Sequence, residues 1–418
     1  MLCQFTVKNY QCIKDELTLD LQATNITENE DSLLIDRDDE KFLPVCAIYG
    51  PNGGGKSTVL NALFSLVCKI MRPICAVSCD NQECQKTSDK VRIQPFSFSK
   101  TTVNEPTEYE LFFRTSLNEY QYLLSVKNNV VINEELYKRG IDGYRYSTVF
   151  CRRPGHKTEL KGSFKDYSYN SISKELTLLS YFGITHGRNK IIKDIISWFD
   201  DYFYYANFGN PFEDARIPIV ESEEMKKIVL DMLKEMDIDI SDYEVEKKDE
   251  QIKVWTVHTI GNTTYRLDLK DESSGTIKIF SLLPILVDGL VKGSTLLIDE
   301  LDAKLHPILL KYIIELFNNP KINKKHAQLI FTSHDLSTMT SEVFRRDEIY
   351  FVAKGDDLSS HMYSLVEFKK EDGTSERKDA KYNKRYLEGK YGADPYLRKI
   401  INLNYSCTSV TAFENSCV

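Results

Sequence analysis

Apolar and polar residues alternate along the chain with two different periods, and the period changes several times. A two-residue period over residues 1–22 predicts two strands joined by a turn, and the same period over 91–165 predicts an antiparallel meander. Helical spacing follows, with apolar residues three and four positions apart over 171–205 and 221–236. We therefore expect a β-rich segment followed by a helical one.

Three continuous apolar runs stand apart from these periodic stretches, at residues 43–49, 295–299 and 327–332. Such runs are typical of strands in a parallel sheet whose two faces are both covered. A predicted helix over 58–67 follows the first run, and another over 276–290 precedes the second. Because the first run lies near the start and the others in the last third, we expect one parallel-sheet domain split by a large insertion.

The residues after the first run match the phosphate-binding loop pattern G-x-x-x-x-G-K-[ST], with the letters GPNGGGKS at 50–57. A strand before the loop and a helix after it argue against a glycine-rich turn that binds nothing. Glycines let backbone N–H groups surround a phosphate, Lys56 is expected to reach the β- and γ-phosphates, and Ser57 to bind Mg²⁺. The nucleotide-binding candidates are Asn52, Gly53, Gly54, Gly55, Lys56, Ser57 and Thr58.

The second apolar run ends in an acidic pair, Asp299 and Glu300. The strand delivers Asp299 to its carboxyl end, where we expect it to hold Mg²⁺ beside Ser57. Glu300 is then placed to polarise the attacking water. An apolar strand that ends in two acidic residues often has no catalytic role. The complete phosphate loop upstream makes a catalytic role the better interpretation here. The pair predicts Mg²⁺-dependent ATP hydrolysis rather than ATP held as a static ligand, because a nucleotide holder needs no base.

Two short motifs flank the acidic strand. Ser273 and Gly275 begin a predicted helix, where free backbone N–H groups bind anions, although a simple helix cap has the same composition. His334 directly follows the third run, where an imidazole can hydrogen-bond a γ-phosphate, although a single histidine there is usually incidental. Because both motifs occur in a fixed order with the phosphate loop and the acidic strand, we interpret both as parts of the nucleotide site.

The order of phosphate loop, Ser-Ser-Gly-Thr, Leu-Ile-Asp-Glu and Ser-His resembles the ABC-type ATPases in the broad sense, the heads of SMC, Rad50 and RecF proteins. The resemblance implies a head-to-head dimer with two ATP molecules at the interface, in which Ser273 and Gly275 act on the partner's nucleotide. It also implies that Asp299 binds magnesium, that Glu300 is the general base and that His334 senses the γ-phosphate.

Two features depart from that family's pattern. The letters ESSGT at 272–276 replace the usual LSGGQ, and Gln94 is the only candidate for the Q-loop glutamine. The changed signature disfavours the transporter branch, as does the lack of about eighteen consecutive apolar residues for a membrane span.

A narrower resemblance is to the OLD-like and abortive-infection ATPases, the AAA_15/AAA_21 group. Four stretches carry it, at residues 7–15, 134–137, 299–307 and 386–396. It implies a stand-alone ATPase of a bacterial anti-phage system that controls a separately encoded effector, often a TOPRIM-type or HNH nuclease. OLD proteins fuse a TOPRIM nuclease after the ATPase, and we expect the segment beyond His334 to be too short for one.

Composition narrows the remaining functions. The 418 residues carry a net charge of −8 with a pI of about 5.6, so any nucleic-acid contact must be local. With no export signal at the start, we expect a cytoplasmic protein whose ten cysteines are reduced. The spacing of Cys75, Cys79 and Cys84 does not favour zinc, and Asp356–Asp357 is more typical of a solvated turn than of a nuclease metal site.

One basic patch, residues 377–390, interleaves lysine and arginine with Tyr382 and Tyr386. Such a patch can bind a phosphate backbone with its tyrosines stacked on bases, or dock a partner protein. Acidic residues dilute its charge, so a solvated helix face fits the pattern as well. Direct DNA binding would favour the alternative function, a RecF-like repair ATPase.

These observations together predict an α/β fold, a P-loop NTPase with an ABC-ATPase-type head that is split by a β-meander and a helical insertion. The expected parts are the first part of the head over 1–95, an antiparallel β lobe over 96–165, a helical insertion over 166–240 and the rest of the head over 241–418. The predicted function is an ATP-hydrolysing regulatory subunit of a prokaryotic anti-phage (abortive infection) system. It is expected to act as a homodimer or higher homo-oligomer on a separate nuclease or toxin.

Overall fold

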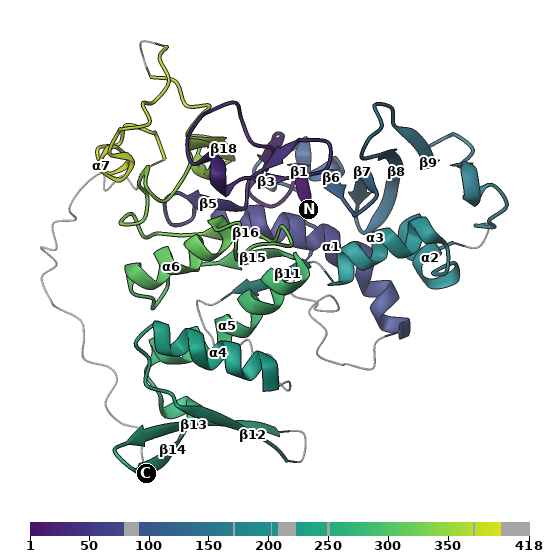
Figure 1. Ribbon diagram of the computed structural model, residues 1–418. Helices are drawn as coiled ribbons and strands as arrows, with labels where there is room; N and C mark the ends of the chain where they lie inside the picture. Colours follow the sequence, from purple (N-terminus) through teal and green to yellow (C-terminus); the bar gives the residue numbers. More distant parts are fainter. Residues whose placement is uncertain are drawn as a thin grey trace, which may run out of the picture.

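The computed structural model is built around two large sheets that lie side by side (Figure 1). The described residues are 1–78, 92–169, 172–201, 203–207, 223–248, 251–370 and 373–393. Cys79, Cys84 and the last residues of the 386–396 stretch therefore lie outside the described part of the chain.

A six-stranded sheet forms the centre of the head. In order across the sheet, its strands are β11 (Phe203–Asn207), β15 (Thr295–Asp299), β16 (Gln328–Thr332), β5 (Val45–Tyr49), β17 (Ile349–Lys354) and β18 (Ser360–Ser364). The first five run parallel, and β18 is antiparallel at the edge. Because β5 is inserted between two strands from the last third of the chain, the split parallel-sheet domain predicted from the apolar runs is confirmed.

Alternate side chains of this sheet enter two separate hydrophobic cores. In β5, Ile48 packs on the side of α1 (Lys56–Ser78), whereas Ala47 packs with α5 (Ser274–Lys292) and α6 (Pro307–Asn318). All five residues of β5, β15 and β16 are buried. Burial on both faces explains why these strands appear in the sequence as continuous apolar runs.

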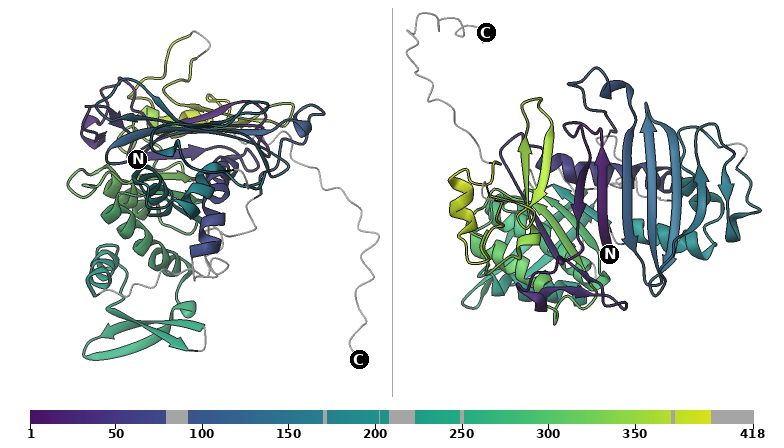
Figure 2. Two further views of the ribbon diagram at one scale, coloured as in Figure 1. Left: turned by 90° about the vertical axis from the view of Figure 1, so that its right-hand side faces the viewer. Right: turned by 90° about the horizontal axis from the view of Figure 1, so that it is seen from above.

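A seven-stranded antiparallel sheet forms a lobe beside the head. In order across the sheet, its strands are β10 (Glu159–Leu160), β9 (Ser147–Arg152), β8 (Val130–Gly140), β7 (Asn118–Lys127), β6 (Thr107–Arg114), β1 (Leu2–Lys8) and β2 (Leu17–Asp20). One face of the sheet packs on α1 together with α2 (Leu178–Thr185) and α3 (Lys190–Asp201) (Figure 2). The predicted meander is present as β6 to β10.

Two pairings cross the proposed domain division. β1 pairs with β6, placing Phe5 opposite Leu111, so the first strands join the lobe sheet rather than the head sheet. β11, within the segment expected to be a helical insertion, pairs with β15 in the head sheet. Hydrophobic periodicity reveals strands but not their distant partners, which is why the sequence placed both segments elsewhere.

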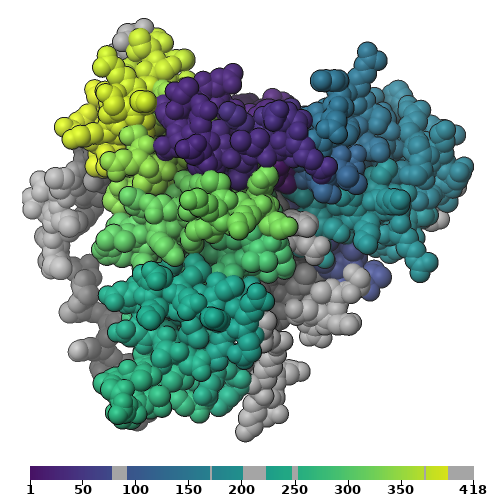
Figure 3. All heavy atoms as spheres, in the orientation of Figure 1, coloured from purple at the N-terminus to yellow at the C-terminus, as the bar shows by residue number. Residues whose placement is uncertain are grey.

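A small three-stranded antiparallel sheet projects from the head beyond α4 (Glu223–Glu235), at the foot of the view in Figures 1 and 3. Its strands are β12 (Asp242–Lys248), β13 (Gln251–Ile260) and β14 (Thr263–Asp268). The remaining elements are β3 (Leu34–Ile35), β4 (Lys41–Phe42), α7 (Tyr382–Leu387) and the 3₁₀ helices η1 (Glu30–Ser32), η3 (Thr102–Asn104), η4 (Gly162–Phe164), η5 (Leu269–Asp271) and η6 (Arg346–Glu348).

Buried hydrogen bonds fix the lobe to the head. The Leu2 amide donates to Gln328 Oε1 at 2.7 Å, and Gln328 Nε2 donates to the Leu2 carbonyl at 3.0 Å. At the other strand of this edge, the Tyr350 hydroxyl donates to the Asp20 carbonyl at 2.8 Å. Unpaired polar groups are costly when buried, so these bonds hold β1 and β2 against the head sheet.

Two helices have the length and apolar composition of a membrane span, α1 over residues 56–77 and α5 over residues 274–292. The sequence analysis expected no spanning segment. Most of each helix is buried inside the fold, where α1 and α5 cover opposite faces of the head sheet. Their packing on the sheet accounts for the apolar composition.

Glu348, at the end of η6, is a fully buried carboxyl group whose Oε2 accepts a hydrogen bond from the Arg345 amide at 2.8 Å. Burial raises its pKa to about 8. The folded pKa thus lies above the unfolded value of about 4.5, so the stability this group contributes is full below pH 4.5 and is lost as pH rises through 8.

We expect Glu348→Gln to remove this pH dependence, because glutamine keeps the hydrogen-bond acceptor without a charge. Urea unfolding should show the variant gaining free energy of unfolding relative to the wild type between pH 5 and pH 8.5. A difference between the two proteins that stays the same at both pH values would contradict a buried, protonated Glu348.

Candidate active site

The loop over residues 50–57 connects the end of β5 to the start of α1, and it has no room for side chains at two glycines. A Cβ at Gly50 would collide with the backbone of β17, and one at Gly55, where φ is +111°, would collide with Ser360 Oγ. Ser360 Oγ donates to the Gly54 carbonyl at 2.6 Å, and the Ser360 amide donates to the Cys12 carbonyl at 2.8 Å. The start of β18 and the turn after β1 therefore brace the loop, a support that no motif in the sequence indicated.

The buried amine of Lys56 lies inside this loop. It donates to the carbonyl oxygens of Gly50 at 2.9 Å and Pro51 at 3.1 Å. Burial lowers the pKa of Lys56, and the neighbouring carboxylate of Asp299 opposes that shift. The loop thus holds a preorganised cation next to its own backbone N–H groups, as phosphate binding requires.

A chain of hydrogen bonds joins the loop to the ends of β15 and β16. Ser57 Oγ donates to Asp299 Oδ1 at 3.0 Å, and Thr332 Oγ1 donates to the same oxygen at 2.5 Å. The Glu300 amide in turn donates to Thr332 Oγ1 at 2.7 Å. The structure therefore brings Ser57 and Asp299 together, and it adds Thr332, which the sequence analysis overlooked, as the link between the two acidic residues.

Ser57 and Asp299 fit a Mg²⁺ ion. A hydroxyl and a carboxylate are the hard oxygen ligands that this ion prefers, and the two groups are already in contact. Asp299 is buried, so a cation beside it would offset the cost of burying its charge.

Glu300 lies directly after β15 in a left-handed backbone conformation, with φ at +52°. This turn reverses the chain, and the Leu301 amide then donates to the Thr332 carbonyl at 3.1 Å. The Glu300 side chain is only partly buried. It is next to the Mg²⁺ candidates in the chain and still reaches solvent, a combination that suits a group required to take a proton from water.

Lys278 connects the Ser273 helix, α5, to the turn after β15. Its fully buried amine donates to the carbonyl oxygens of Glu300 and Leu301, each at 2.8 Å. Burial lowers the pKa of Lys278 to about 7, and the carboxylate of Asp302 opposes the shift. A lysine in the middle of an apolar helix was the available signal for this contact, and the sequence analysis did not use it.

His334 lies beside the same turn. Its amide donates to Asp302 Oδ2 at 3.1 Å, which ties the end of β16 to the residues after Glu300. Partial burial lowers the pKa of His334, and the positive charge of Lys56 lowers it further. The imidazole is therefore neutral near pH 7, close to the loop that carries Lys56.

Ser273 and Gly275 are not joined to the phosphate loop by any contact among the described residues. Ser273 is the N-cap of α5, with Oγ accepting from the Thr276 amide at 3.1 Å, and its side chain is exposed. Gly275 lies against the chain after β15, where a Cβ would come within 3.2 Å of the Lys304 carbonyl. Within one copy, these residues behave as the helix cap that the sequence also allowed.

Two weaker candidates also have clear positions. Gln94 is exposed, and its carbonyl accepts from the Gln11 amide at 2.7 Å. Asp357 pairs with Lys14 at 2.8 Å and with Ser359, so it is engaged in a surface turn. Among the residues that the structure describes, no group of three or more His, Cys, Asp or Glu side chains is arranged to hold a metal ion.

The basic patch at 377–390 differs from its expected form. Tyr382 and Tyr386 are buried in the head core, where Tyr386 stacks on Phe351 with ring centroids 5.5 Å apart. The prediction that these tyrosines could stack on bases was wrong, because the aromatic face of α7 packs on the head core. Arg385 pairs with buried Glu376 at 2.6 Å, so the exposed cations that remain are Arg377, Lys378, Lys381, Lys384 and Lys390.

Thr332→Val should uncouple the two acidic residues, because it removes both the donor to Asp299 and the acceptor for the Glu300 amide. We expect a loss of about 10–100-fold in ATPase activity or in apparent Mg²⁺ affinity. Phosphate release measured across a Mg²⁺ titration tests this, with Thr332→Ser as the matched control that keeps the hydroxyl. Equal activity of the valine and serine variants would contradict the role given to Thr332.

Comparisons with known proteins agree with this geometry. The sequence profile of the family AAA_21, described as "AAA domain, putative AbiEii toxin, Type IV TA system", matches residues 45–340. No curated protein matches the chain.

Several solved structures match at low identity. The SMC head domain from Thermotoga maritima has a TM-score of 0.43 at 15% identity, covering 87% of this chain and 98% of that one. An SmcHead bound to the C-winged helix domain of ScpA has a TM-score of 0.42 at 14% identity, covering 87% and 97%. The Pyrococcus furiosus Smc head with an extended coiled coil, bound to the C-terminal domain of ScpA, has 0.41 at 12%, covering 87% and 96%.

The family match begins at β5, includes the phosphate loop and α5, and continues past β15, β16 and His334. It therefore covers the phosphate loop, the helix of Ser273 and the strands that carry Asp299 and Thr332, whereas β17, β18 and the turn at Cys12, which brace the loop, lie outside it. The chain belongs to the AAA_21 family and is a P-loop ATPase.

Proposed function

We propose that this protein hydrolyses ATP with Mg²⁺ at sites shared between two copies of the chain, and that hydrolysis regulates a separate effector in an anti-phage defence system. The observation that carries the hydrolysis is the continuous hydrogen-bonded chain from Ser57 through Asp299 and Thr332 to Glu300. The chain ends at the Glu300 backbone amide and so fixes the backbone from which the partly exposed Glu300 carboxylate projects, an arrangement that a protein storing ATP without hydrolysing it would not need.

In the proposed mechanism, the loop amides and Lys56 hold the β- and γ-phosphates, and Ser57 and Asp299 hold the metal. Mg²⁺, when bound, neutralises charge on the phosphate oxygens. Glu300 accepts a proton from the attacking water as the water approaches the γ-phosphorus. His334, neutral near pH 7, donates a hydrogen bond to a γ-phosphate oxygen and so distinguishes ATP from ADP.

The position of Ser273 supports a site completed by a second copy. It begins a long helix and is exposed, and within its own chain it makes no described contact with the phosphate loop. Lys278, one turn further along the same helix, holds the Glu300 and Leu301 carbonyls. If the Ser273 of one copy binds the γ-phosphate of its partner's ATP, a shift of its helix would move the Glu300 turn of the same copy through Lys278. The two ATP sites would then be coupled.

The defence role rests on the family description, which names an AbiEii-type toxin, and on the resemblance to abortive-infection ATPases. In this proposal the protein is cytoplasmic, and ATP locks a homodimer or larger assembly. A phage-derived signal then shifts that assembly and releases or activates a nuclease or toxin encoded separately.

Phage plating on cells that carry the gene with its neighbours tests the defence proposal. Wild type should reduce plating, and both Lys56→Ala and Glu300→Gln should restore it to the level of cells without the gene. Full protection by both variants would overturn the proposal. A RecF-like repair role predicts instead that the purified protein binds DNA through residues 377–390, a patch left without available tyrosines.

A further inference from the structure

A cavity lies at the edge of the head sheet where β15 and β16 begin, opposite to the edge that carries the phosphate loop. It has a volume of about 950 Å³ and is lined by residues of the lobe, of α3 and of the head, together with Met1. These elements and the N-terminus lie close together in Figure 1. Gly293 and His326, which line it, precede β15 and β16, whereas Asp299 and Thr332 end the same strands. Five residues at about 3.3 Å each therefore separate it from the candidate active site by roughly 16 Å.

Lysines from separate parts of the fold converge on this cavity. The lining lysines are Lys138 from β8, Lys190 and Lys193 from α3, Lys292 from the end of α5 and Lys325 from the loop before β16. Lys292 pairs with Asp288 at 2.8 Å. The other four form no ion pair with any acidic side chain in the described part of the chain. This is notable because the protein has a net charge of −8 and therefore more acidic than basic residues.

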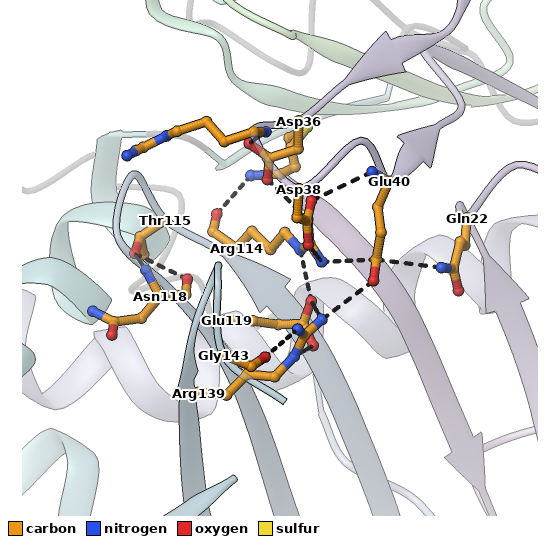
Figure 4. Close-up of polar contacts among 12 residues, drawn as sticks. Gln22, Asp36, Asp38, Glu40, Arg114, Thr115, Asn118, Glu119, Arg139 and Gly143 are labelled. Carbon is orange, nitrogen blue, oxygen red and sulfur yellow. Dashed lines mark hydrogen bonds and ion pairs between the residues drawn. The ribbon is translucent and has the colours of Figure 1, made fainter. Parts of the chain in front are cut away.

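The acidic residues in the cavity wall are already engaged. Asp194 accepts hydrogen bonds from Thr115 Oγ1 at 2.7 Å and from the Tyr120 hydroxyl at 2.9 Å. Asp36 pairs with buried Arg114 at 2.9 Å, part of the ion-pair network drawn in Figure 4. Neither acid forms an ion pair with the four lysines, so the cavity retains a surplus of positive charge.

The backbone around the cavity is held closely. Gly293, with φ at +79°, ends α5, and a Cβ there would collide with the Lys325 carbonyl, so glycine lets the ends of the two lysine-bearing loops approach. The Met1 amine donates to the Arg114 carbonyl at 2.8 Å and joins the lobe wall to the start of the chain. The first contact fixes the backbone of the head wall and the second that of the lobe wall, so the backbone positions on these two sides of the cavity are set.

We propose that this cavity binds the phosphate groups of a nucleotide or of a single nucleic-acid strand, at a site separate from the ATP site. Four free ammonium groups attract phosphate, and the accessible apolar residues Leu117 and Ile191 in the same wall offer contact area for a sugar or base. The volume is in the range of ligand sites in proteins, and it suits free nucleotides or a single strand rather than a duplex.

Fluorescence anisotropy with a labelled single-stranded oligonucleotide tests the proposal directly. If all four lysines contact phosphates, the logarithm of affinity should fall with the logarithm of salt with a slope of about −2.8, or about 50-fold between 50 and 200 mM salt. The double variant Lys190→Gln/Lys193→Gln should reduce the slope to about −1.4, so that affinity falls only about 7-fold. The matched control is Lys378→Gln/Lys381→Gln in the α7 patch, which should keep the wild-type slope.

The source of the phosphate is distinguished by competition. If unlabelled nucleoside monophosphate displaces the oligonucleotide, the site binds free nucleotides. If only longer strands displace it, the site binds nucleic acid. Either result supports the proposal. Absence of oligonucleotide binding by the wild type, or a Lys190/Lys193 variant that binds as the wild type does, would overturn it. ATPase activity should be unchanged in this variant, which shows that it is folded and that the result is independent of the hydrolysis proposal.

Discussion

Glu300→Gln is expected to lower kcat for ATP hydrolysis by about 10²–10⁴-fold, because it removes the group that takes the proton from water. ATP affinity should stay close to the wild-type value, since Glu300 follows the metal candidates and does not form part of the phosphate loop. Lys56→Ala should differ in kind, because it removes the buried cation of the loop and weakens ATP binding as well.

Steady-state phosphate release and equilibrium binding of a labelled ATP analogue separate the two effects. Glu315→Gln is the matched control, because Glu315 is an exposed residue of α6 whose carboxylate pairs with the exposed amine of Lys311 at 3.7 Å. A Glu300→Gln variant with wild-type kcat would show that this carboxylate is not the base, even if the loop binds ATP as described.

Arg114→Leu is expected to cost about 3–5 kcal/mol of stability, because it removes the fully buried cation that pairs with four carboxylates. Figure 4 shows Arg114 enclosed by Asp36, Asp38, Glu40 and Glu119. Its guanidinium donates to all four at 2.6–2.9 Å. Without it, these carboxylates would face one another around a buried gap.

The loss should depend on pH. Burial acts to raise the pKa of Asp38, but the hydrogen bonds and the charge of Arg114, together with backbone hydrogen bonds, lower the pKa overall. A lowered folded pKa gives stability that is present above the unfolded value of about 3.8 and is lost as pH falls through the folded value. The destabilisation of Arg114→Leu should therefore be large at pH 7 and smaller in acid.

Urea unfolding at pH 7 and at about pH 2.5, below the unfolded value, measures this, with Arg266→Leu as the control. Arg266 pairs with Glu244 and Glu246 on the exposed sheet of β12 to β14, so its loss should cost no more than about 1 kcal/mol. Equal effects of the two substitutions at pH 7 would contradict the structural role given to the Arg114 network.

The parts of the fold that were predicted correctly are those whose pattern lies within one short stretch of sequence. The head strands are buried on both faces and appear as uninterrupted apolar runs, and the phosphate loop has a fixed pattern between a strand and a helix. The meeting of Ser57 and Asp299 followed from strand direction, because parallel strands end at one edge of the sheet. These predictions needed no knowledge of distant contacts.

The parts that the sequence missed depend on contacts between distant segments. Thr332 and Lys278 have no motif of their own, and their roles follow only from where β16 and α5 lie relative to Glu300. Tyr382 and Tyr386 fitted a base-stacking pattern, but a short amphipathic helix presents its aromatic residues equally well to a core. Charge counts along the sequence likewise gave no sign that acids at 36–40 surround Arg114.

The central claim is that two copies of the chain complete each ATP site, with Ser273 of one copy facing Lys56 of the other. Mixing two inactive variants, Lys56→Ala and Ser273→Arg, tests it most directly by steady-state phosphate release. In a two-fold symmetric dimer, random exchange should restore about a quarter of wild-type activity, because half of the dimers are mixed and each has one intact composite site. Activity that stays at the level of the separate variants, although exchange of subunits is demonstrated, would contradict a shared site.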